Sequence, residues 1–443
     1  DFCLSRGLGD VYKRQVLGRA GAWCGQNKYL SAIKNAFQNF MPLTIAGAIG
    51  VLWCNVLVNE STGLGIFFKP IMALEFLNPA FQAVNFCTIS CITVGITLGI
   101  AQEIGVWNMG AEKAGYIPGL VGLAAWLSVT NTSHMVEGAK EAFTGIAGNE
   151  LGATGLFTGM IIGVLSVELF CFFEKQDALK IKMPEQVPPG VARAFEVLVP
   201  ATITLIITAC IGSACYNLTG LYLNDVIKNG IQGPLGAVGA TIPGVMIIYL
   251  VIMLFWLVGI HGNNMLSAVK EALFTPLALE NVEAFNKHQT PKNIINMYAL
   301  QMWGEFGGSG VTIGLVIAIM IFGKREDNKA IATLSLVPGL FNINETVTFG
   351  IPMVLNPILG IPFVVAPLIT IIIGYVLTVI GFCPVACLTV PWTTPPIVFG
   401  FLACGANVMG AVTQAILIVV STVIYVPFLI AYEKYQNKQA AEA

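Results

Sequence analysis

The chain has 443 residues, of which 56% are hydrophobic and 10% are charged, whereas about 25% of the residues in an average soluble domain are charged. So few charges cannot cover a water-facing surface, which excludes a soluble enzyme, a disordered chain and a nucleic-acid-binding protein. The 22 basic and 24 acidic residues nearly balance, so the net charge indicates no anionic partner. We therefore expect an all-α polytopic membrane protein whose solvent is the lipid bilayer, with no nucleic acid as a partner.

The N-terminal segment 1–28 is polar, and residues such as Arg6, Asp10 and Lys13 stand where a signal peptide would have its apolar region. We expect this segment to be partly an artefact of the reading frame and attach no function to its first fifteen residues. Apolar runs of about 20 residues, the length that crosses a bilayer, then predict spans near 41–58, 82–101, 115–130, 152–173, 197–217 and 236–260. Further apolar runs, interrupted by Gly and Pro, bring the expected total to about ten spans; they lie at 296–322, 331–360, 362–381 and 398–431.

The main polar interruption of the first half is segment 174–195, which carries Lys175, Lys180, Lys182 and Arg193. The positive-inside rule places such a basic segment in the cytoplasm, which requires an even number of crossings before it. The basic stretch 323–330 and the C-terminal Lys434 and Lys438 are expected on the same side. Both termini are therefore predicted to be cytoplasmic.

Most of the 11 cysteines lie within apolar runs, which is not the pattern of a secreted disulfide framework. Cys87 and Cys91, and also Cys383 and Cys387, have the i,i+4 spacing of one helix face. No histidine accompanies either pair, so packing is favoured over metal binding, and no metal site is expected.

Glu345 is the single charged residue between Ala330 and Tyr432. A carboxylate at membrane depth is costly unless it faces a cavity or a partner, so it is a candidate site residue. Asn342 and Asn344 supply amide groups beside it, in a segment that Gly and Pro keep from being a regular helix. The alternative is a loop end that faces water in the headgroup region.

His261 lies in the segment FWLVGIHGNN, which also contains Trp256. Gly259 and Gly262 permit the close approach of a backbone or a ligand. A lone histidine near a membrane boundary is often only an interfacial residue. Its setting, which matches that of the isolated Glu345, favours a role in a binding site.

Two more broken segments follow, WGEFGGSGVTIGL at 303–315 and LTVPWTTPPIVFGF at 388–401. The first contains Ser309 and predicts a hairpin or re-entrant turn, since it lacks the ending of a phosphate-binding loop; its Glu305 is expected to face water. The second contains Trp392, which can stack on the apolar face of a sugar ring or serve as an interfacial anchor. Polar groups in broken intramembrane segments are typical of transporters that bind a polar solute, and with no Arg or Lys placed to hold an anion the solute should be uncharged.

Several motifs together resemble one family, the lactose/cellobiose (diacetylchitobiose) family of enzyme IIC permeases of phosphoenolpyruvate-dependent phosphotransferase systems (PTS). The resemblance covers about residues 25–435 and is carried by GIHG at 259–262, GGSG at 307–310, NINE leading into FGIPMVLNP at 342–357, and PWTTPP at 391–396. It implies a homodimer of ten-span protomers in the bacterial inner membrane. It also implies an N-terminal scaffold and dimerisation half, 29–217, and a sugar-carrying half with two re-entrant hairpins, 218–435, before a cytoplasmic tail, 436–443.

The resemblance further implies a function. The carrying half moves like an elevator and presents a β-linked disaccharide, such as cellobiose, diacetylchitobiose or lactose, for phosphorylation by the B component (IIB), which is supplied in turn by IIA, HPr and enzyme I. His261 and Glu345 match the family residues that hold the reacting hydroxyl, with Glu345 assisting the chemistry. No cofactor is expected to be bound, the phosphoryl group coming from phospho-IIB, and no appended B domain is apparent, so the donor is expected to be another polypeptide.

Two alternatives to this function remain open at this point. The nearer is a proton-coupled sugar symporter in which Glu345 titrates as the coupling group. A membrane-embedded glycosyltransferase or hydrolase is more distant, because it would need a second carboxylate or metal ligands near the first. The chain is not expected to catalyse a reaction on its own.

Overall fold

The computed structural model describes residues 26–60, 65, 68–134, 143–184, 186–351, 353 and 356–442. Nearly all of the polar segment expected over 1–28 lies outside these residues. The described chain is helical except for one antiparallel pair of two-residue strands, β1 (Ser133–His134) and β2 (Phe143–Thr144), with Ser133 opposite Thr144. Two compact units are present, one containing Asn27–Gly50 and Pro79–Ala237 and the other Val51–Asn78 and Val238–Ala443.

Five of the described helices are long and apolar enough to cross a bilayer. They cover Lys28–Leu57, Ala153–Glu174, Pro189–Thr219, Gly360–Val379 and Val408–Gln439. A bent pair, Lys69–Ser90 and Ile92–Met109, makes a sixth candidate, and three shorter apolar helices are Ile117–Val129, Ile242–Leu257 and Ile313–Phe322. The prediction of an all-helical multi-pass membrane protein is therefore confirmed.

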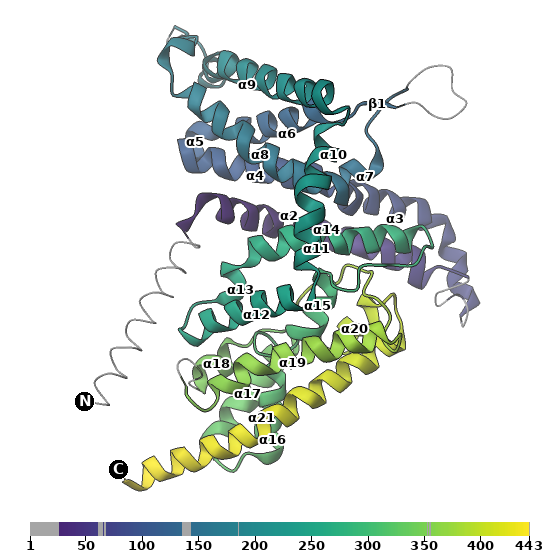
Figure 1. Ribbon diagram of the computed structural model, residues 1–443, viewed down its shortest axis with the longest axis vertical. Helices are drawn as coiled ribbons and strands as arrows, with labels where there is room; N and C mark the ends of the chain where they lie inside the picture. The colour runs from purple at the N-terminus through teal and green to yellow at the C-terminus, as the bar shows by residue number, and fades with distance from the viewer. Residues whose placement is uncertain are drawn as a thin grey trace. The chain divides into compact units, whose positions relative to one another are not determined.

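The unit that contains most of the first half is built around three packed helices, α4 (Ile92–Met109), α6 (Ile117–Val129) and α8 (Ala153–Glu174), with α9 (Pro189–Thr219) against α6 (Figure 1). Gly122 of α6 allows a close approach, since a Cβ there would lie 2.3 Å from that of Ala101 in α4. The remaining elements of the chain up to its middle are α2 (Lys28–Leu52), η1 (Trp53–Leu57), η3 (Lys69–Leu77), α3 (Asn78–Asn85), η4 (Phe86–Ser90), α5 (Ala111–Ala114), α7 (Gly148–Leu151), η5 (Asp177–Leu179), α10 (Leu223–Ile227), η6 (Lys228–Gln232) and α11 (Gly233–Gly239).

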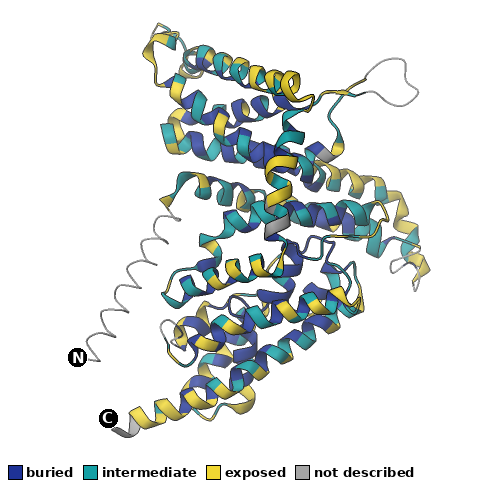
Figure 2. Ribbon diagram, viewed as in Figure 1, coloured by how far each residue is buried: buried dark blue, intermediate teal, exposed yellow. Residues whose placement is uncertain are grey.

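The interior of this unit is apolar, while α9 leaves much of its apolar surface uncovered (Figure 2). Ile100 and Trp126 are buried, whereas Leu198, Ile206 and Ile211 of α9 are each about half exposed. Apolar side chains exposed along a membrane-length helix face lipid or another protein chain. The outer face of α9 is therefore a surface for the bilayer or for a partner.

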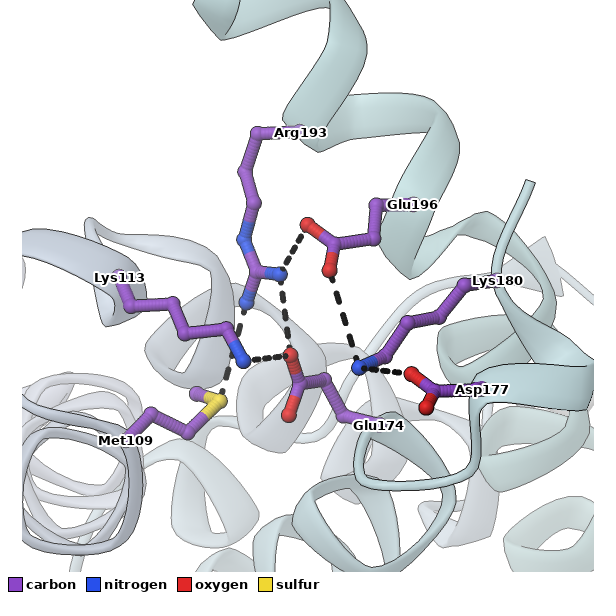
Figure 3. A network of polar contacts seen from close by, with 7 residues as sticks. All are labelled: Met109, Lys113, Glu174, Asp177, Lys180, Arg193 and Glu196. Atoms are coloured by element: carbon purple, nitrogen blue, oxygen red, sulfur yellow. Dashed lines mark hydrogen bonds and ion pairs between the residues drawn. The ribbon is translucent and has the colours of Figure 1, made fainter. Parts of the chain in front are cut away.

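A network of charged side chains joins helices of the same unit (Figure 3). Glu174, the last residue of α8, is 1% exposed and accepts from Lys113 Nζ at 2.8 Å and from Arg193 Nη1 at 3.0 Å. Arg193 also binds Glu196, and Lys180 binds Asp177. Two cations compensate the buried carboxylate and join α5, α8 and α9 at the end of the spans. The basic segment predicted to be cytoplasmic is thus part of an ordered structure.

The other unit contains the remaining helices of the second half. They are α12 (Ile242–Leu257), α13 (Gly262–Met265), α14 (Ser267–Asn286), α15 (Met297–Gly304), α16 (Ile313–Phe322), α17 (Glu326–Leu340), α18 (Glu345–Gly350), α19 (Gly360–Val379), α20 (Val398–Ala403) and α21 (Val408–Glu442). The long helix α21 packs against α16, α19 and α20, and α17 packs on α16 (Figure 1). The expected tail 436–443 continues α21 as helix as far as Glu442.

Near its C-terminus α21 holds the start of α17 through one buried carboxylate. Glu433, which is 6% exposed, accepts from the backbone N–H groups of Lys324 and Arg325 at 2.9 and 3.3 Å and from Asn328 Nδ2 at 3.2 Å. These donors lie before and within the first turn of α17, where backbone N–H groups have no partner within the helix. We call this arrangement the Glu433 clasp.

Candidate functional site

The turn after α12 places His261. Thr241 caps the start of α12 by accepting from Gly244 N at 3.2 Å, and the helix ends at a turn where Gly259 has φ 83°, a conformation that favours glycine. His261 then caps α13, its Nδ1 accepting from the backbone N–H of Asn264 at 3.3 Å. In the neutral ring the proton therefore belongs on Nε2.

His261 Nε2 faces the carboxylate of Glu345, the first residue of α18, at 4.0 Å. The two side chains are 40% and 49% exposed, so both are open to a ligand. At 4.0 Å they form no direct hydrogen bond, but a hydroxyl oxygen placed between them can accept from one and donate to the other. Residues 84 positions apart in the sequence are thus brought together as the proposed binding pair.

Glu345 differs from expectation in its exposure. The sequence predicts a carboxylate buried among apolar residues, whereas the carboxylate is half exposed and its neighbour Asn344 is the buried one, 4% exposed. Adjacent residues at the start of a short helix point in different directions, so the segment buries one side chain and presents the next.

Asn342 joins three irregular segments. Its Oδ1 accepts from Gly307 N at 2.6 Å, and its Nδ2 donates to the carbonyl oxygens of Trp392 and, at 3.1 Å, Thr394. Its φ of 62° lies in the left-handed region that asparagine tolerates better than most residues. The broken segments that contain Gly307, Asn342 and Trp392 therefore meet at this side chain.

Asn344 and Ser309 make a second link between the same segments. Asn344 Nδ2 donates to the Ser309 carbonyl at 2.7 Å, and Ser309 Oγ donates to Asn263 Oδ1 at 3.3 Å. Gly308, at φ 88°, passes so near Asn344 that a Cβ would lie 2.5 Å from its Cγ. The amides predicted to offer groups to a solute are here occupied largely by the protein backbone.

The two tryptophans named from the sequence have different surroundings. The Trp256 ring lies 4.4 Å from that of His261, centroid to centroid, and its edge-on neighbour is Phe363 at 6.4 Å. It is 2% exposed, and its Nε1 has no hydrogen-bond partner among the described residues. Trp392 is 43% exposed, with its carbonyl held by Asn342. Of the two indole rings, that of Trp392 is the one exposed at the surface.

The expectation that Glu305 faces water is wrong. Its side chain is 16% exposed, forms an ion pair with Lys270 and accepts from Tyr249 OH at 2.8 Å. Lys270, itself 5% exposed, belongs to α14, a helix that hydropathy does not predict because it carries several charges. The signal available in the sequence is the position of Glu305 between Trp303 and Phe306, where a charge at depth needs a partner of opposite sign.

Cys383, one of the two cysteines spaced as a second pair, has a partner far away in the sequence. Cys383 lies 3.9 Å from Cys404, sulfur to sulfur, rather than beside Cys387, and all three are buried. Among the described residues no group of three or more His, Cys, Asp or Glu side chains is arranged to hold a metal ion.

Known proteins are similar to this chain in both sequence and structure. The family described as "Phosphotransferase system, EIIC" matches residues 34–367. The oligo-beta-mannoside-specific EIIC component of Bacillus subtilis (strain 168) is 33% identical over 92% of this chain and 90% of its own length, and the cellobiose-specific EIIC component of Lactococcus lactis subsp. lactis (strain IL1403) is 30% identical over 97% and 99%. The crystal structure of ChbC, the IIC component of the N,N'-diacetylchitobiose-specific phosphotransferase system, superposes with a TM-score of 0.86 at 30% identity, covering 95% of this chain and 97% of ChbC.

Proposed function

Because the chain belongs to the EIIC family of phosphotransferase-system permeases, we propose that it binds a β-linked disaccharide with His261 and Glu345 and carries it across the bacterial inner membrane for phosphorylation. The observation that carries this proposal is the pairing of His261 Nε2 with the Glu345 carboxylate at 4.0 Å on two exposed side chains. The sugar class is supported by the relatives, whose names specify oligo-β-mannosides, cellobiose and diacetylchitobiose. Lactose fits the same groups.

The pair can hold and prepare one sugar hydroxyl. His261 Nε2–H donates to the hydroxyl oxygen and fixes its direction, while Glu345 accepts the hydroxyl proton in a hydrogen bond. When the oxygen attacks the phosphoryl group carried by phospho-IIB, the bond from phosphorus to the donor breaks and the proton passes to Glu345. Positioning and proton transfer are thus the contributions of this chain, and the phosphoryl group comes from its partner.

The other predicted site residues have supporting roles in this proposal. The half-exposed Trp392 offers an aromatic face on which a sugar ring can stack. The buried Trp256 ring backs the His261 ring. Asn342, Asn344 and Ser309 hold the loops in place. An uncharged ligand suits the site, since the charge of Lys270 is neutralised by Glu305.

The larger architecture is proposed from the family and the helices together. We expect ten spans and two re-entrant hairpins per protomer, with N- and C-termini in the cytoplasm and a homodimer formed through the N-terminal half. The exposed apolar face of α9 is a suitable surface for such a dimer. The C-terminal half would carry the sugar, moving as an elevator against the N-terminal half. Its IIB partner, supplied by IIA, HPr and enzyme I, would act on the cytoplasmic side.

The test is a comparison of His261→Asn and Glu345→Gln with two matched controls, His288→Asn and Glu326→Gln, at exposed positions. Purified protein is titrated calorimetrically with cellobiose, diacetylchitobiose and lactose. We expect each site variant to weaken binding of the preferred sugar at least tenfold, because each loses a charge-assisted or directed hydrogen bond worth about 1.5–3 kcal/mol, and the controls to bind as the wild type does.

A second readout is sugar phosphate formation in vesicles supplied with IIB, IIA, HPr, enzyme I and phosphoenolpyruvate. The wild type should form sugar phosphate only with the complete phosphoryl chain, and Glu345→Gln should form little. Uptake driven by a pH gradient without phosphoenolpyruvate would instead indicate a symporter. Wild-type binding and phosphorylation by both site variants would refute the assignment of the site.

A further inference from the structure

A cluster of buried side chains, two of them charged, joins the helices before and after His261 to the end of α15. It consists of Lys270, Glu305 and Tyr249, with Glu305 accepting from both of the others and Lys270 Nζ lying 5.5 Å from the centre of the Tyr249 ring. Tyr249 is 1% exposed and Lys270 5% exposed. We call these three residues the Glu305 cluster.

The Glu305 cluster connects the segments on both sides of His261 to residues 306–310, which we call the glycine-rich loop. Tyr249 belongs to α12, which leads into the His261 turn, and Lys270 belongs to α14, which follows α13. Glu305 directly precedes the loop 306–310, whose Gly307 and Ser309 bind Asn342 and Asn344. One carboxylate therefore relates the position of His261 to that of the segment that carries Glu345.

Stability alone is a weak reason for such a cluster. A buried ion pair is costly to desolvate, and apolar residues of similar volume are often as stabilising or more so. In a bilayer the cost is higher still, and ionisable residues at depth usually serve binding or transport. The cluster also lies close enough to interact electrostatically with His261, as Glu345 does.

We propose that the Glu305 cluster is a positioning and charge-balancing element of the sugar site. It holds the His261 turn at its distance from the glycine-rich loop and pairs the charges of Lys270 and Glu305 behind the imidazole, beside the separate carboxyl group of Glu271, which accepts from Thr275 Oγ1. Its residues touch neither the sugar nor the phosphoryl group; they act through His261 and the loop. This inference rests on the proposed function, because it assumes that His261 binds the sugar.

The experiment measures the sugar dissociation constant from pH 5 to 9 for Lys270→Met, Glu305→Gln and the double variant. Lys270→Met leaves an uncompensated carboxylate near His261, which favours the imidazolium, so the pH midpoint of binding should move up. Glu305→Gln leaves an uncompensated ammonium group, so the midpoint should move down. The double variant should return to the wild-type midpoint, since Glu345, Glu271 and the neutral Tyr249 are unchanged, yet bind several-fold more weakly because the tether is lost.

Opposite shifts that cancel in the double variant are not expected from a merely structural cluster. An unchanged midpoint in both single variants, with or without weaker binding, would overturn the proposal. If the single variants fail to fold, Lys270→Arg and Glu305→Asp keep the charges and test the tether alone; they should keep the wild-type midpoint and lose affinity, and unchanged affinity would count against the tether.

The exposed pair Lys287 and Glu283 of the same helix provides the matched control, and Lys287→Met and Glu283→Gln should leave affinity and midpoint unchanged. The proposed function fails if His261→Asn binds sugar as the wild type does. The present inference alone fails if His261→Asn loses binding while the variants of the Glu305 cluster keep both wild-type affinity and midpoint.

Discussion

Asn342 shows how a single side chain can hold an irregular site together. It satisfies one backbone N–H and two carbonyl groups from two other segments, while its own backbone is left-handed. Val311 and Ile397, two β-branched residues in the adjoining segments, also have positive φ, at 49° and 74°. Such residues adopt this conformation only where their surroundings impose it, and they often mark functional sites.

Asn342→Ala is expected to lower the free energy of unfolding by about 1–3 kcal/mol, because Gly307 N–H and two carbonyl groups lose their partner. Asn342→Asp keeps the acceptor for Gly307 but not the donor, so it should fall between wild type and the alanine variant. The measurement is denaturant unfolding in detergent followed by tryptophan fluorescence. An alanine variant as stable as the wild type would show that water replaces these contacts at no cost.

Helix packing in the second-half unit depends on places where only glycine fits. A Cβ on Gly314 of α16 would lie 2.1 Å from Ser421 Oγ and 2.8 Å from two backbone atoms of α21. Because backbone cannot move aside as a side chain does, this contact sets the separation of the two helices. Gly339 of α17, by contrast, has one side-chain atom 3.4 Å from where its Cβ would lie.

Gly314→Ala should therefore destabilise the protein by about 1–3 kcal/mol through overpacking, visible as a lower midpoint of thermal unfolding in detergent. Gly339→Ala is the control, and it should be neutral or slightly stabilising because alanine favours a helix over glycine. Equal midpoints for the two variants would mean that α16 and α21 separate without cost.

Element by element, the sequence predicts best where the chain is continuously apolar. The expected spans 152–173, 197–217 and 362–381 correspond to α8, α9 and α19, since uninterrupted hydropathy determines a membrane-length helix. The helix α14 is missed, because its charged residues, among them Lys270, lower its hydropathy. The broken segments were located from Gly and Pro, although their meeting at Asn342 depends on side-chain hydrogen bonds over long sequence separations.

Within the candidate site, His261 and Glu345 are predicted because each is an isolated polar residue in an apolar context, and their side chains lie 4.0 Å apart in the structure. Glu305 was misjudged for a related reason. It is partnered by Lys270, 35 positions away in a helix that hydropathy does not predict, so its apolar neighbours in sequence indicate that it needs a partner but not which residue supplies one.

For the whole molecule, the distribution of charge predicts which loops share a side of the membrane. Four crossings precede the basic segment after Glu174 when Lys28–Leu57, the bent pair Lys69–Ser90 and Ile92–Met109, the shorter Ile117–Val129, and Ala153–Glu174 are each counted as one. An even number of crossings is what the positive-inside rule requires, and the topology stays a prediction. The strand pair β1 and β2 follows the third of them and is expected on the opposite, outer side.

Single cysteines at Ser133, Lys182 and Lys434, all exposed positions, test this topology. A membrane-impermeant maleimide applied to intact cells should label Ser133→Cys above the background of the native cysteines. Lys182→Cys and Lys434→Cys should be labelled only after permeabilisation. Labelling of Lys434→Cys in intact cells would contradict a cytoplasmic C-terminus.

The Glu433 clasp has a mechanical consequence. The helix that supplies it, α21, also donates from Tyr425 OH to the Gly310 carbonyl of the glycine-rich loop at 2.8 Å, while α17 runs about 22 Å over its 15 residues from the clasp toward Asn342. Two helices thus lead from the Glu433 clasp to the candidate site, α21 to Gly310 and α17 to Asn342. A displacement of the start of α17 at the clasp would therefore be passed along both helices toward the loops that hold Gly310 and Asn342.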